Sequence, residues 1–343
     1  MEKIDVNSAI KFRNKQWENN KYIPKWVNIK DVDLDHFCTR PDIAQKCWYN
    51  FCKYLKKEKV NLSKYIFIEP SAGLGAFYNL LPEKRRIGID IVKDNNNFIQ
   101  QDFLSWKPKD RNKKYICVGN PPFGYRAWLA LAFVNHASLF SDYIAFIVPM
   151  AFQSNGKSNV KDRVNGFHLV HSSLLPSDSF IDINGKTVKI NALWQIWKKG
   201  NGIKKVEKTC DEYIDLFTVD MRKERKCGHR RLHEADFFLQ RTFYTEPPKL
   251  VKSFDKVKYV CGYGIVIKKE RDNVLKILQN ADWKVYSNLA SHNCRHISME
   301  HIRKALINAG FIDSKRIKEE NATIYEFNRP INIAVKSCER EAY

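Results

Sequence analysis

Residues 115–123 read Tyr115-Ile116-Cys117-Val118-Gly119-Asn120-Pro121-Pro122-Phe123, an apolar run that ends in an amide, two prolines and an aromatic ring. A second apolar run, Tyr65-Ile66-Phe67-Ile68, ends in Glu69-Pro70-Ser71-Ala72-Gly73-Leu74-Gly75 about fifty residues earlier. Short apolar runs bounded by Gly and Pro are typical of buried strands. Each stretch therefore predicts a strand followed by a loop that carries polar groups at the strand's carboxyl end.

Strand-like and helical patterns alternate through the first two thirds of the chain. We expect helices over residues 41–57, 75–81 and 127–139, and strands over residues 65–69, 86–90, 98–101, 114–119, 143–148, 168–175 and 188–197. Such alternation indicates an α/β fold with a mostly parallel sheet and helices on both faces. Ligands bind these sheets at the carboxyl ends of the strands, where both motifs fall.

Composition divides the chain into three regions. Residues 1–35 are polar and basic, with Trp17 and Trp26 as isolated anchors, and predict an N-terminal arm. Residues 36–200 hold the α/β pattern, and the Lys, Gly and Asn residues at 198–202 suit a boundary. Residues 201–343 are long enough for a second domain, with a helix expected over residues 298–309.

Lys and Arg outnumber Asp and Glu by 59 to 38, a formal net charge of +21. This surplus favours a polyanionic partner, because neutralising phosphates releases counterions. A Lys- and Asn-rich proteome alone would also produce it, so the motifs must decide. The nine cysteines lack paired spacing, and neither a signal peptide nor a run of ~20 apolar residues is present. We expect a soluble, cytoplasmic protein that does not enter membranes.

Three successive strand ends carry groups that suit a nucleoside-containing cofactor. The Gly73 and Gly75 turn lets the backbone approach a ligand. Asp90, followed by Ile91, could accept hydrogen bonds from ribose hydroxyls, and Asp102 could accept an adenine amine with Phe103 against the ring. Each acid alone could equally be a helix cap or a solvated loop end.

A dinucleotide-binding enzyme is the main rival. The dinucleotide fingerprint has three spaced glycines around a pyrophosphate, whereas the third position here is not glycine. Glu69 would repel a pyrophosphate but tolerates the cationic methionine end of S-adenosylmethionine. The turn therefore favours the methyl donor.

The Asn-Pro-Pro-Phe element suits an exocyclic amine such as N6 of adenine. The Asn120 side-chain oxygen and the Pro121 carbonyl could each accept one amine hydrogen, so that the nitrogen lone pair points at the methyl group. Pro122 restricts the backbone, and Phe123 offers a face on which an extruded base can stack. The alternative is a Pro-Pro turn that closes a strand over a buried Phe.

Together, residues 120–123 and 69–75 resemble the family of S-adenosylmethionine-dependent amino-methyltransferases that modify adenine N6 or cytosine N4 in DNA, in the motif order of the gamma class. The resemblance covers residues 36–198. It implies an α/β, Rossmann-like class I methyltransferase sheet followed by a smaller C-terminal target-recognition domain. His36–Pro41 resembles the family's cofactor segment, so Phe37 and Thr39 would line the methionine end. Phe180 falls where the family often has a second aromatic against the flipped base.

The resemblance implies a DNA adenine-N6 methyltransferase with S-adenosylmethionine as cofactor and double-stranded DNA as partner, in a restriction-modification or viral setting with or without a cognate endonuclease. The expected cofactor contacts are Phe37, Thr39, Glu69, Pro70, Ser71, Ala72, Gly73, Gly75, Asp90, Ile91, Asp102, Phe103 and Asn120. The expected phosphate contacts are Arg222, Lys223, Arg225, Lys226, Arg230 and Arg231.

Several alternatives stay open. The same chemistry could act on RNA adenine, on cytosine N4 or on a protein glutamine, and a catalytically inactive relative could bind nucleic acid alone. Cytosine-C5 methylation is disfavoured because the sequence has no Pro-Cys dipeptide. Cys210, Cys227, His229 and His233 match no regular zinc spacing, so no metal site is expected.

Overall fold

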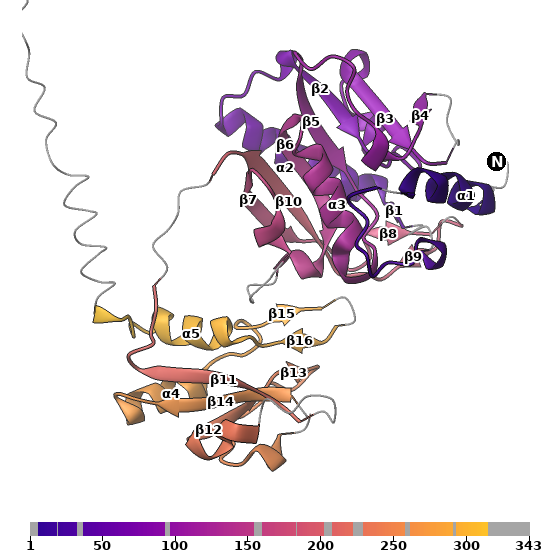
Figure 1. The fold of residues 1–343 in the computed structure, drawn as a ribbon. Coiled ribbons are helices and arrows are strands. Elements are labelled where there is room, and N and C mark those ends of the chain that lie inside the picture. The colour runs from indigo at the N-terminus through magenta and orange to yellow at the C-terminus, as the bar shows by residue number, and fades with distance from the viewer. Residues whose placement is uncertain are drawn as a thin grey trace, which may run out of the picture. The chain divides into compact units, whose positions relative to one another are not determined.

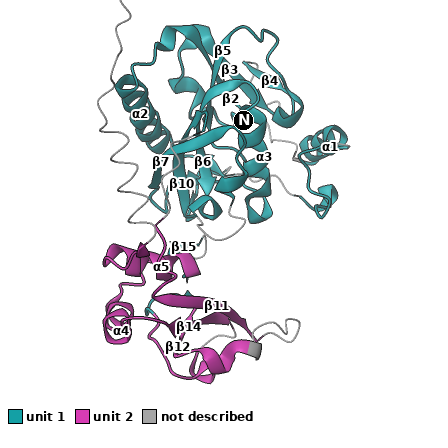
Figure 2. Cartoon of the chain, turned by 60° about the vertical axis from the view of Figure 1, so that its left-hand side comes forward, with its two compact units in different colours: residues 1–204, 242–247, 287–298 teal, residues 205–241, 248–286, 299–343 magenta. Residues whose placement is uncertain are grey.

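The computed structural model describes residues 6–18, 20–32, 37–92, 97–153, 160–182, 184–201, 208–221, 229–257, 261–290 and 293–314. The chain divides into two compact units (Figure 2). Unit 1 comprises residues 1–204, 242–247 and 287–298, and unit 2 comprises residues 205–241, 248–286 and 299–343.

A seven-stranded sheet in the order β4-β3-β2-β5-β6-β10-β7 forms the centre of unit 1 (Figure 1). Its strands are β2 (Tyr65–Glu69), β3 (Arg86–Asp90), β4 (Phe98–Gln100), β5 (Lys114–Gly119), β6 (Ser141–Pro149), β7 (Phe167–Leu174) and β10 (Ala192–Lys199). Strands β2 to β6 pair in parallel, while β10 runs antiparallel to both of its neighbours. This sheet confirms the α/β, Rossmann-like fold expected from the sequence.

Helices cover both faces of the sheet because neighbouring strand residues point to opposite sides. Phe67 and Ile116 pack with α2 (Pro41–Lys57), whose buried stripe includes Phe51. Ile68 and Cys117, one position further along the same strands, pack with α3 (Trp128–Ala137). The helix predicted over residues 41–57 is confirmed at the same bounds.

The N-terminal region is a packed part of unit 1, so the prediction of an arm is wrong for its described residues. It contains α1 (Val6–Trp17), and Trp17 is buried in the core around α3. Tyr22, Ile23, Val27, Ile29 and Val32 pack against the same core. This cover explains why α3 is buried almost all round, since it has the sheet on one side and the N-terminal region on the other.

Two predicted elements differ from the structure. Residues 75–81 form turns and a short 3-10 helix over Tyr78–Leu80, because Gly73 and Gly75 adopt left-handed backbone angles. The strand predicted over residues 188–197 is two strands, β9 (Thr187–Val188) and β10. β9 pairs with β8 (Phe180–Ile181), which pairs with β1 (Cys38–Thr39), so a small sheet brings the segment around Thr39 beside residue 180.

The predicted domain of residues 201–343 includes two segments that belong to unit 1. β13 (Thr242–Phe243), β15 (Asn288–Leu289) and β16 (Arg295–His296) form a small antiparallel sheet there. The Asn191 side chain donates hydrogen bonds to the Ala290 carbonyl at 3.2 Å and to Asn293 Oδ1 at 2.8 Å. These long-range contacts attach residues 242–247 and 287–298 to the larger unit.

Unit 2 is built on an antiparallel sheet in the order β11-β14-β12. Its elements are β11 (Ile214–Asp220), β12 (Phe237–Gln240), β14 (Cys261–Ile267), α4 (Arg271–Asn280) and α5 (Met299–Asn308). The helix predicted over residues 298–309 corresponds to α5. Across the described part of the chain, no helix combines the length and apolar character that a membrane span requires.

Candidate functional site

The two motifs meet at the carboxyl edge of the central sheet. β2 lies between β3 and β5, and all three strands are parallel. Glu69 and Asp90 are therefore the last residues of neighbouring strands, and Asn120 directly follows β5. The topology thus brings together three of the predicted site residues from positions up to about fifty residues apart in the sequence.

Asp90 holds the glycine turn in place. The Gly73 N–H donates to Asp90 Oδ2 at 2.7 Å, and the Val92 N–H donates to Oδ1 at 2.9 Å. Gly73 and Gly75 have φ of +48° and +78°, a region that favours glycine. A carboxylate offers about four acceptor positions, so these two bonds do not exhaust it. Asp90 can organise the turn and still accept a ligand hydroxyl.

Asn120 is held from two sides. Its Nδ2 donates to the Phe37 carbonyl at 3.0 Å, and Ser71 Oγ donates to the Asn120 backbone carbonyl at 2.8 Å. Because only the amide NH₂ can face a carbonyl, the contact with Phe37 also fixes which side of the carboxamide carries the oxygen.

The Asn120 Oδ1 atom is buried and meets no hydrogen-bond partner in the described part of the chain. An unsatisfied buried acceptor costs about 1–3 kcal/mol and calls for an explanation. Thr39 Oγ1 and Glu69 Oε2 share this property, and Thr39 lies two residues from the Phe37 carbonyl that holds Asn120. These three oxygens could accept hydrogens from a ligand. In the described part of the chain, Trp17, His136, Gln195 and Trp197 also carry a buried polar atom without a hydrogen-bond partner.

Glu69 is almost fully buried, with 2% of its surface exposed. Burial raises the pKa of its carboxyl well above the usual value, and the backbone N–H groups of Tyr78 and Phe77 oppose this only in part. A cation bound nearby would favour the ionised form. The position therefore suits the cationic group that the sequence predicts there.

The raised pKa of Glu69 makes stability depend on pH. The folded state keeps the proton to higher pH than the unfolded state, so the destabilisation by Glu69 grows as pH rises above the ordinary carboxyl pKa. Glu69→Gln removes this effect, because an amide carries no titrating proton. We expect the Tm of the variant to exceed that of the wild type at pH 7. The difference should shrink toward pH 4, and a pH-independent difference would contradict the assignment.

A pocket lies beside the glycine turn, where the empty space amounts to about 440 Å³ when the adjoining open solvent is included. The lining residues are Arg13, Trp17, Pro70, Ser71, Asp90, Ile91, Gln101, Asp102, Phe103, Pro122, Leu129 and Phe133. Six of the predicted cofactor residues thus line one cavity together with Pro122 of the Asn-Pro-Pro-Phe element, whereas Phe37, Thr39, Glu69, Ala72, Gly73, Gly75 and Asn120 do not line it.

Asp102 lies at the end of the pocket that α1 closes. Its backbone N–H donates to Gln16 Oε1 at 3.1 Å, and its carboxyl is buried. Burial raises the pKa of this carboxyl, while the nearby Trp17 indole lowers it, although Trp17 Nε1 meets no acceptor with good hydrogen-bond geometry. Asp102 and Trp17 both line the pocket.

The contributions of Arg13, Gln16 and Trp17 were not predicted. Arg13 is buried, lies 4.5 Å from the centre of the Trp17 ring and donates to the Ile29 and Val32 carbonyls. The only sequence signal was the four-residue spacing of Arg13 and Trp17, which places both side chains on one face of a helix.

The two aromatic residues predicted to hold a base lie against one another. The Phe123 and Phe180 rings meet edge to face, 6.3 Å apart at 88°. Phe123 is half-buried, but Phe180 has no exposed surface. Phe180 can therefore touch a base only after Phe123 moves, and its stacking role stays a prediction.

The predicted phosphate contacts are only partly visible. Arg222, Lys223, Arg225 and Lys226 lie outside the described residues, as does the side chain of Arg230. Arg231 forms ion pairs with Asp215 at 2.6 Å and Glu234 at 2.7 Å, so a phosphate would have to compete for its guanidinium. Within the described ranges, no three His, Cys, Asp or Glu side chains come close enough to hold a metal ion, and Cys227 lies outside those ranges.

No protein-family model matches the sequence, and no curated protein matches it either. Among similar solved structures is a Pyrococcus horikoshii protein provisionally described as an RNA methyltransferase, with 19% identity over 56% of this chain and 96% of that one, at a TM-score of 0.35. The magnesium protoporphyrin IX methyltransferase of Synechocystis, with bound SAM, has 16% identity over 57% and 95%, at 0.34. The modification subunit of a provisionally assigned type I restriction enzyme from Vibrio vulnificus has 13% identity over 64% and 53%, at 0.32.

Proposed function

We propose that this chain transfers a methyl group from S-adenosylmethionine to N6 of a flipped-out adenine in DNA. The observation that carries the proposal is the Asn120 carboxamide. Its oxygen is buried and unpaired, and it is held beside the glycine turn by Phe37 and Ser71. An acceptor in this position suits a hydrogen of an amine more than a hydroxyl or a thiol, because a second acceptor, the Pro121 carbonyl, follows in the chain.

The residues of the pocket fit the cofactor. Asp90 would bind the ribose hydroxyls, and Asp102 with Phe103 would bind the adenine ring at the end closed by α1. Glu69, Thr39 and Phe37 would face the methionine end, where two unsatisfied oxygens await donors. The cofactor supplies an electrophilic methyl group on a sulfonium. A buried, readily protonated Glu69 matches it because it can become ionised when a positive charge arrives.

Catalysis by the chain's own residues would consist of positioning. Asn120 Oδ1 and the Pro121 carbonyl each accept one amine hydrogen, which withdraws the nitrogen lone pair from conjugation with the ring. The two prolines restrict the direction of the backbone carbonyls, and Phe37 restrains the carboxamide. A carboxamide cannot act as a base, so the proton lost by the methylated amine goes to water. Most of the acceleration would come from orientation and electrostatics.

The charge of the chain supports a nucleic-acid substrate, and unit 2 would supply target recognition. The net charge is +21, which favours binding to a phosphate backbone. Flipping is required for a duplex substrate because a stacked base cannot reach a pocket at the edge of a sheet.

The test is expression in a host that lacks adenine methylation, followed by sequencing of its DNA with modification-sensitive reads. We expect N6-methyladenine within a fixed sequence context for the wild type and none for Asn120→Ala. Mass spectrometry of the nucleosides from DNA and RNA distinguishes N4-methylcytosine and methylated RNA. Methylated RNA without methylated DNA would move the proposal to an RNA substrate, and the absence of any methylated nucleoside would refute it.

A further inference from the structure

We infer that Trp26 and Tyr125 form a stacking surface for the nucleotides next to the target base. This inference rests on the proposed function, since it assumes a nucleic acid at the Asn-Pro-Pro-Phe loop. The Trp26 side chain is 58% exposed and the Tyr125 side chain 68% exposed, although large aromatic rings are usually mostly buried. Their rings meet edge to face, with centroids 6.2 Å apart at 78°. We call this pair the Trp26–Tyr125 surface.

The exposure of Trp26 follows from how its segment is anchored. Tyr22, Ile23 and Val27 pack against the core around α3, and the Tyr22 ring lies 5.3 Å from the ring of His136. The chain on both sides of Trp26 is therefore anchored to the core, while the indole faces solvent beside the exposed Lys25. A Trp that served only to pack the segment would be expected to point with its neighbours.

Tyr125 is held outward by a costly turn directly after the Asn-Pro-Pro-Phe element. Gly124 has a φ of +66°, and a Cβ there would lie 2.7 Å from the Leu129 Cβ, so only glycine fits. Arg126 and Ala127 also adopt left-handed angles, at +56° and +61°. Backbone of this kind is unfavourable for non-glycine residues and clusters at functional sites. The turn places an exposed ring five residues from Asn120.

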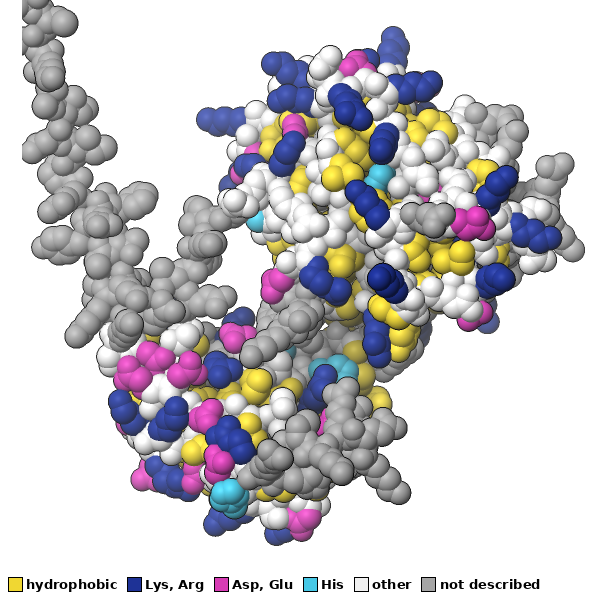
Figure 3. Space-filling view, viewed as in Figure 1, with side chains coloured by type: hydrophobic (Ala, Val, Ile, Leu, Met, Phe, Trp, Pro, Cys, Tyr) yellow, Lys and Arg dark blue, Asp and Glu magenta, His cyan; other side chains and the backbone are white. Residues whose placement is uncertain are grey.

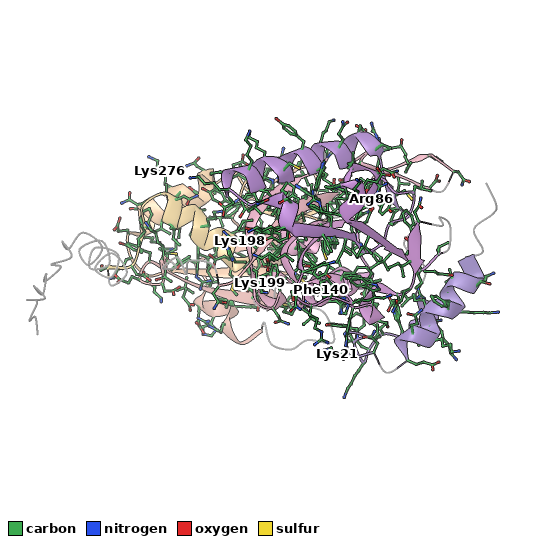
Figure 4. All side chains as sticks on the ribbon, turned by 90° about the horizontal axis from the view of Figure 1, so that it is seen from above. Lys21, Arg86, Phe140, Lys198, Lys199 and Lys276 are labelled. Atoms are coloured by element: carbon green, nitrogen blue, oxygen red, sulfur yellow. The ribbon has the colours of Figure 1, made fainter. Side chains whose placement is uncertain are left out.

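Charge selects a nucleic acid as the occupant. Neither residues 20–30 nor residues 119–127 contain an Asp or Glu, whereas Lys21, Lys25, Lys30 and Arg126 are exposed. The Arg126 guanidinium lies 5.0 Å from the centre of the Tyr125 ring. Lys21 projects away from the ribbon in Figure 4. Cations interleaved with exposed aromatic rings are the pattern by which proteins bind single strands, with phosphates on the cations and bases on the rings.

The distribution of charge along the chain agrees with this placement. Residues 1–200 contain 31 Lys and Arg against 18 Asp and Glu, so they carry +13 of the +21. Figure 3 shows Lys and Arg side chains spread over the visible face of unit 1 with few Asp and Glu among them. The Lys and Arg side chains that could bind phosphates are therefore not confined to the second half of the chain, where the predicted phosphate contacts lie.

The test measures binding of a fluorescent 30-nucleotide DNA oligonucleotide by anisotropy, single-stranded and as a duplex. For Trp26→Ala/Tyr125→Ala we expect Kd to rise about 10- to 100-fold, because each missing ring removes the stacking contact with one base. Trp26→Phe/Tyr125→Phe retains both rings and should stay within about 3-fold of the wild type. The matched control is Tyr49→Ala, which removes a 71% exposed aromatic ring from α2 and should leave Kd unchanged.

Each outcome decides a separate point. If the double alanine variant binds the oligonucleotide as tightly as Tyr49→Ala does, the inference is overturned and the two rings become candidates for a protein contact. If the wild type binds no oligonucleotide, the inference fails as well. If the wild type transfers methyl groups but its affinity for the oligonucleotide does not depend on the two rings, the proposed function stays intact. Ring-dependent binding without any methyl transfer would support the Trp26–Tyr125 surface and refute the proposed function.

Discussion

Replacing Asn120 with alanine is expected to lower the rate of methyl transfer by a factor of about 10² to 10³, with little change in the affinity for S-adenosylmethionine. The variant loses the one buried, unpaired acceptor that follows β5. It keeps the backbone carbonyl that Ser71 holds and does not touch the pocket lining around Asp90 and Asp102. Single-turnover transfer of a tritiated methyl group measures the rate, and calorimetry measures cofactor binding.

Two further variants separate chemistry from structure at this position. Asn120→Asp keeps an oxygen acceptor but loses the donation to the Phe37 carbonyl. It should be impaired because repulsion between the carboxylate and that carbonyl displaces the oxygen. Ser71→Ala removes the hydrogen bond to the Asn120 carbonyl and should cost a few-fold in rate, in line with a loss of about 1 kcal/mol. Equal losses of rate and cofactor affinity in Asn120→Ala would show that the residue is structural.

The sheet was predictable because its strands are short apolar runs that end in Gly, Pro or acidic residues. The bounds of α2 were predictable for a related reason, since Pro41 suits its first turn and its buried residues repeat at helical spacing. The glycine turn misled the helix prediction over residues 75–81, because a left-handed Gly75 ends any regular helix there.

Long-range contacts account for the other errors. α1 has a polar sequence, and its burial depends on Trp17 and Arg13 meeting α3 and the carbonyls of residues 29–32. The four-residue spacing of Arg13 and Trp17 indicates one face of a helix but not the partner that this face meets. The attachment of residues 287–298 to unit 1 likewise depends on hydrogen bonds from Asn191, about a hundred residues away.

Some features of the candidate site were likewise predictable from the sequence, and others depend on long-range packing. That Glu69, Asp90 and Asn120 follow strands could be inferred from the sequence, and parallel topology then placed them at one edge. Which of their oxygens lack partners depends on side-chain packing, and so does the burial of Phe180 beneath Phe123. The sequence therefore placed these residues at one edge of the sheet, while the structure shows which of their oxygens lack a hydrogen-bond partner in the described part of the chain.

Trp17→Ala is expected to destabilise unit 1 by about 3–5 kcal/mol, the usual cost of removing a large buried aromatic side chain. Trp17 is 3% exposed and meets the Trp128 ring edge to face at 5.5 Å, so its loss leaves a cavity between α1 and α3. Because Trp17 also lines the pocket beside Asp102, cofactor affinity should fall with stability. Thermal unfolding with and without S-adenosylmethionine measures both effects, and the wild type should gain more Tm from the cofactor than the variant does.

Trp26→Ala is the matched control, since it removes the same side chain from the same N-terminal region at a position that is 58% exposed. Its stability should stay within about 0.5 kcal/mol of the wild type, and its Tm should respond fully to the cofactor. Trp17→Phe keeps a ring in the core. Its stability and its cofactor affinity should lie between those of Trp17→Ala and Trp26→Ala. If Trp17→Ala were as stable as Trp26→Ala and bound the cofactor equally well, α1 would not be a wall of the pocket. The N-terminal region would then be better described as the arm that its polar composition predicts.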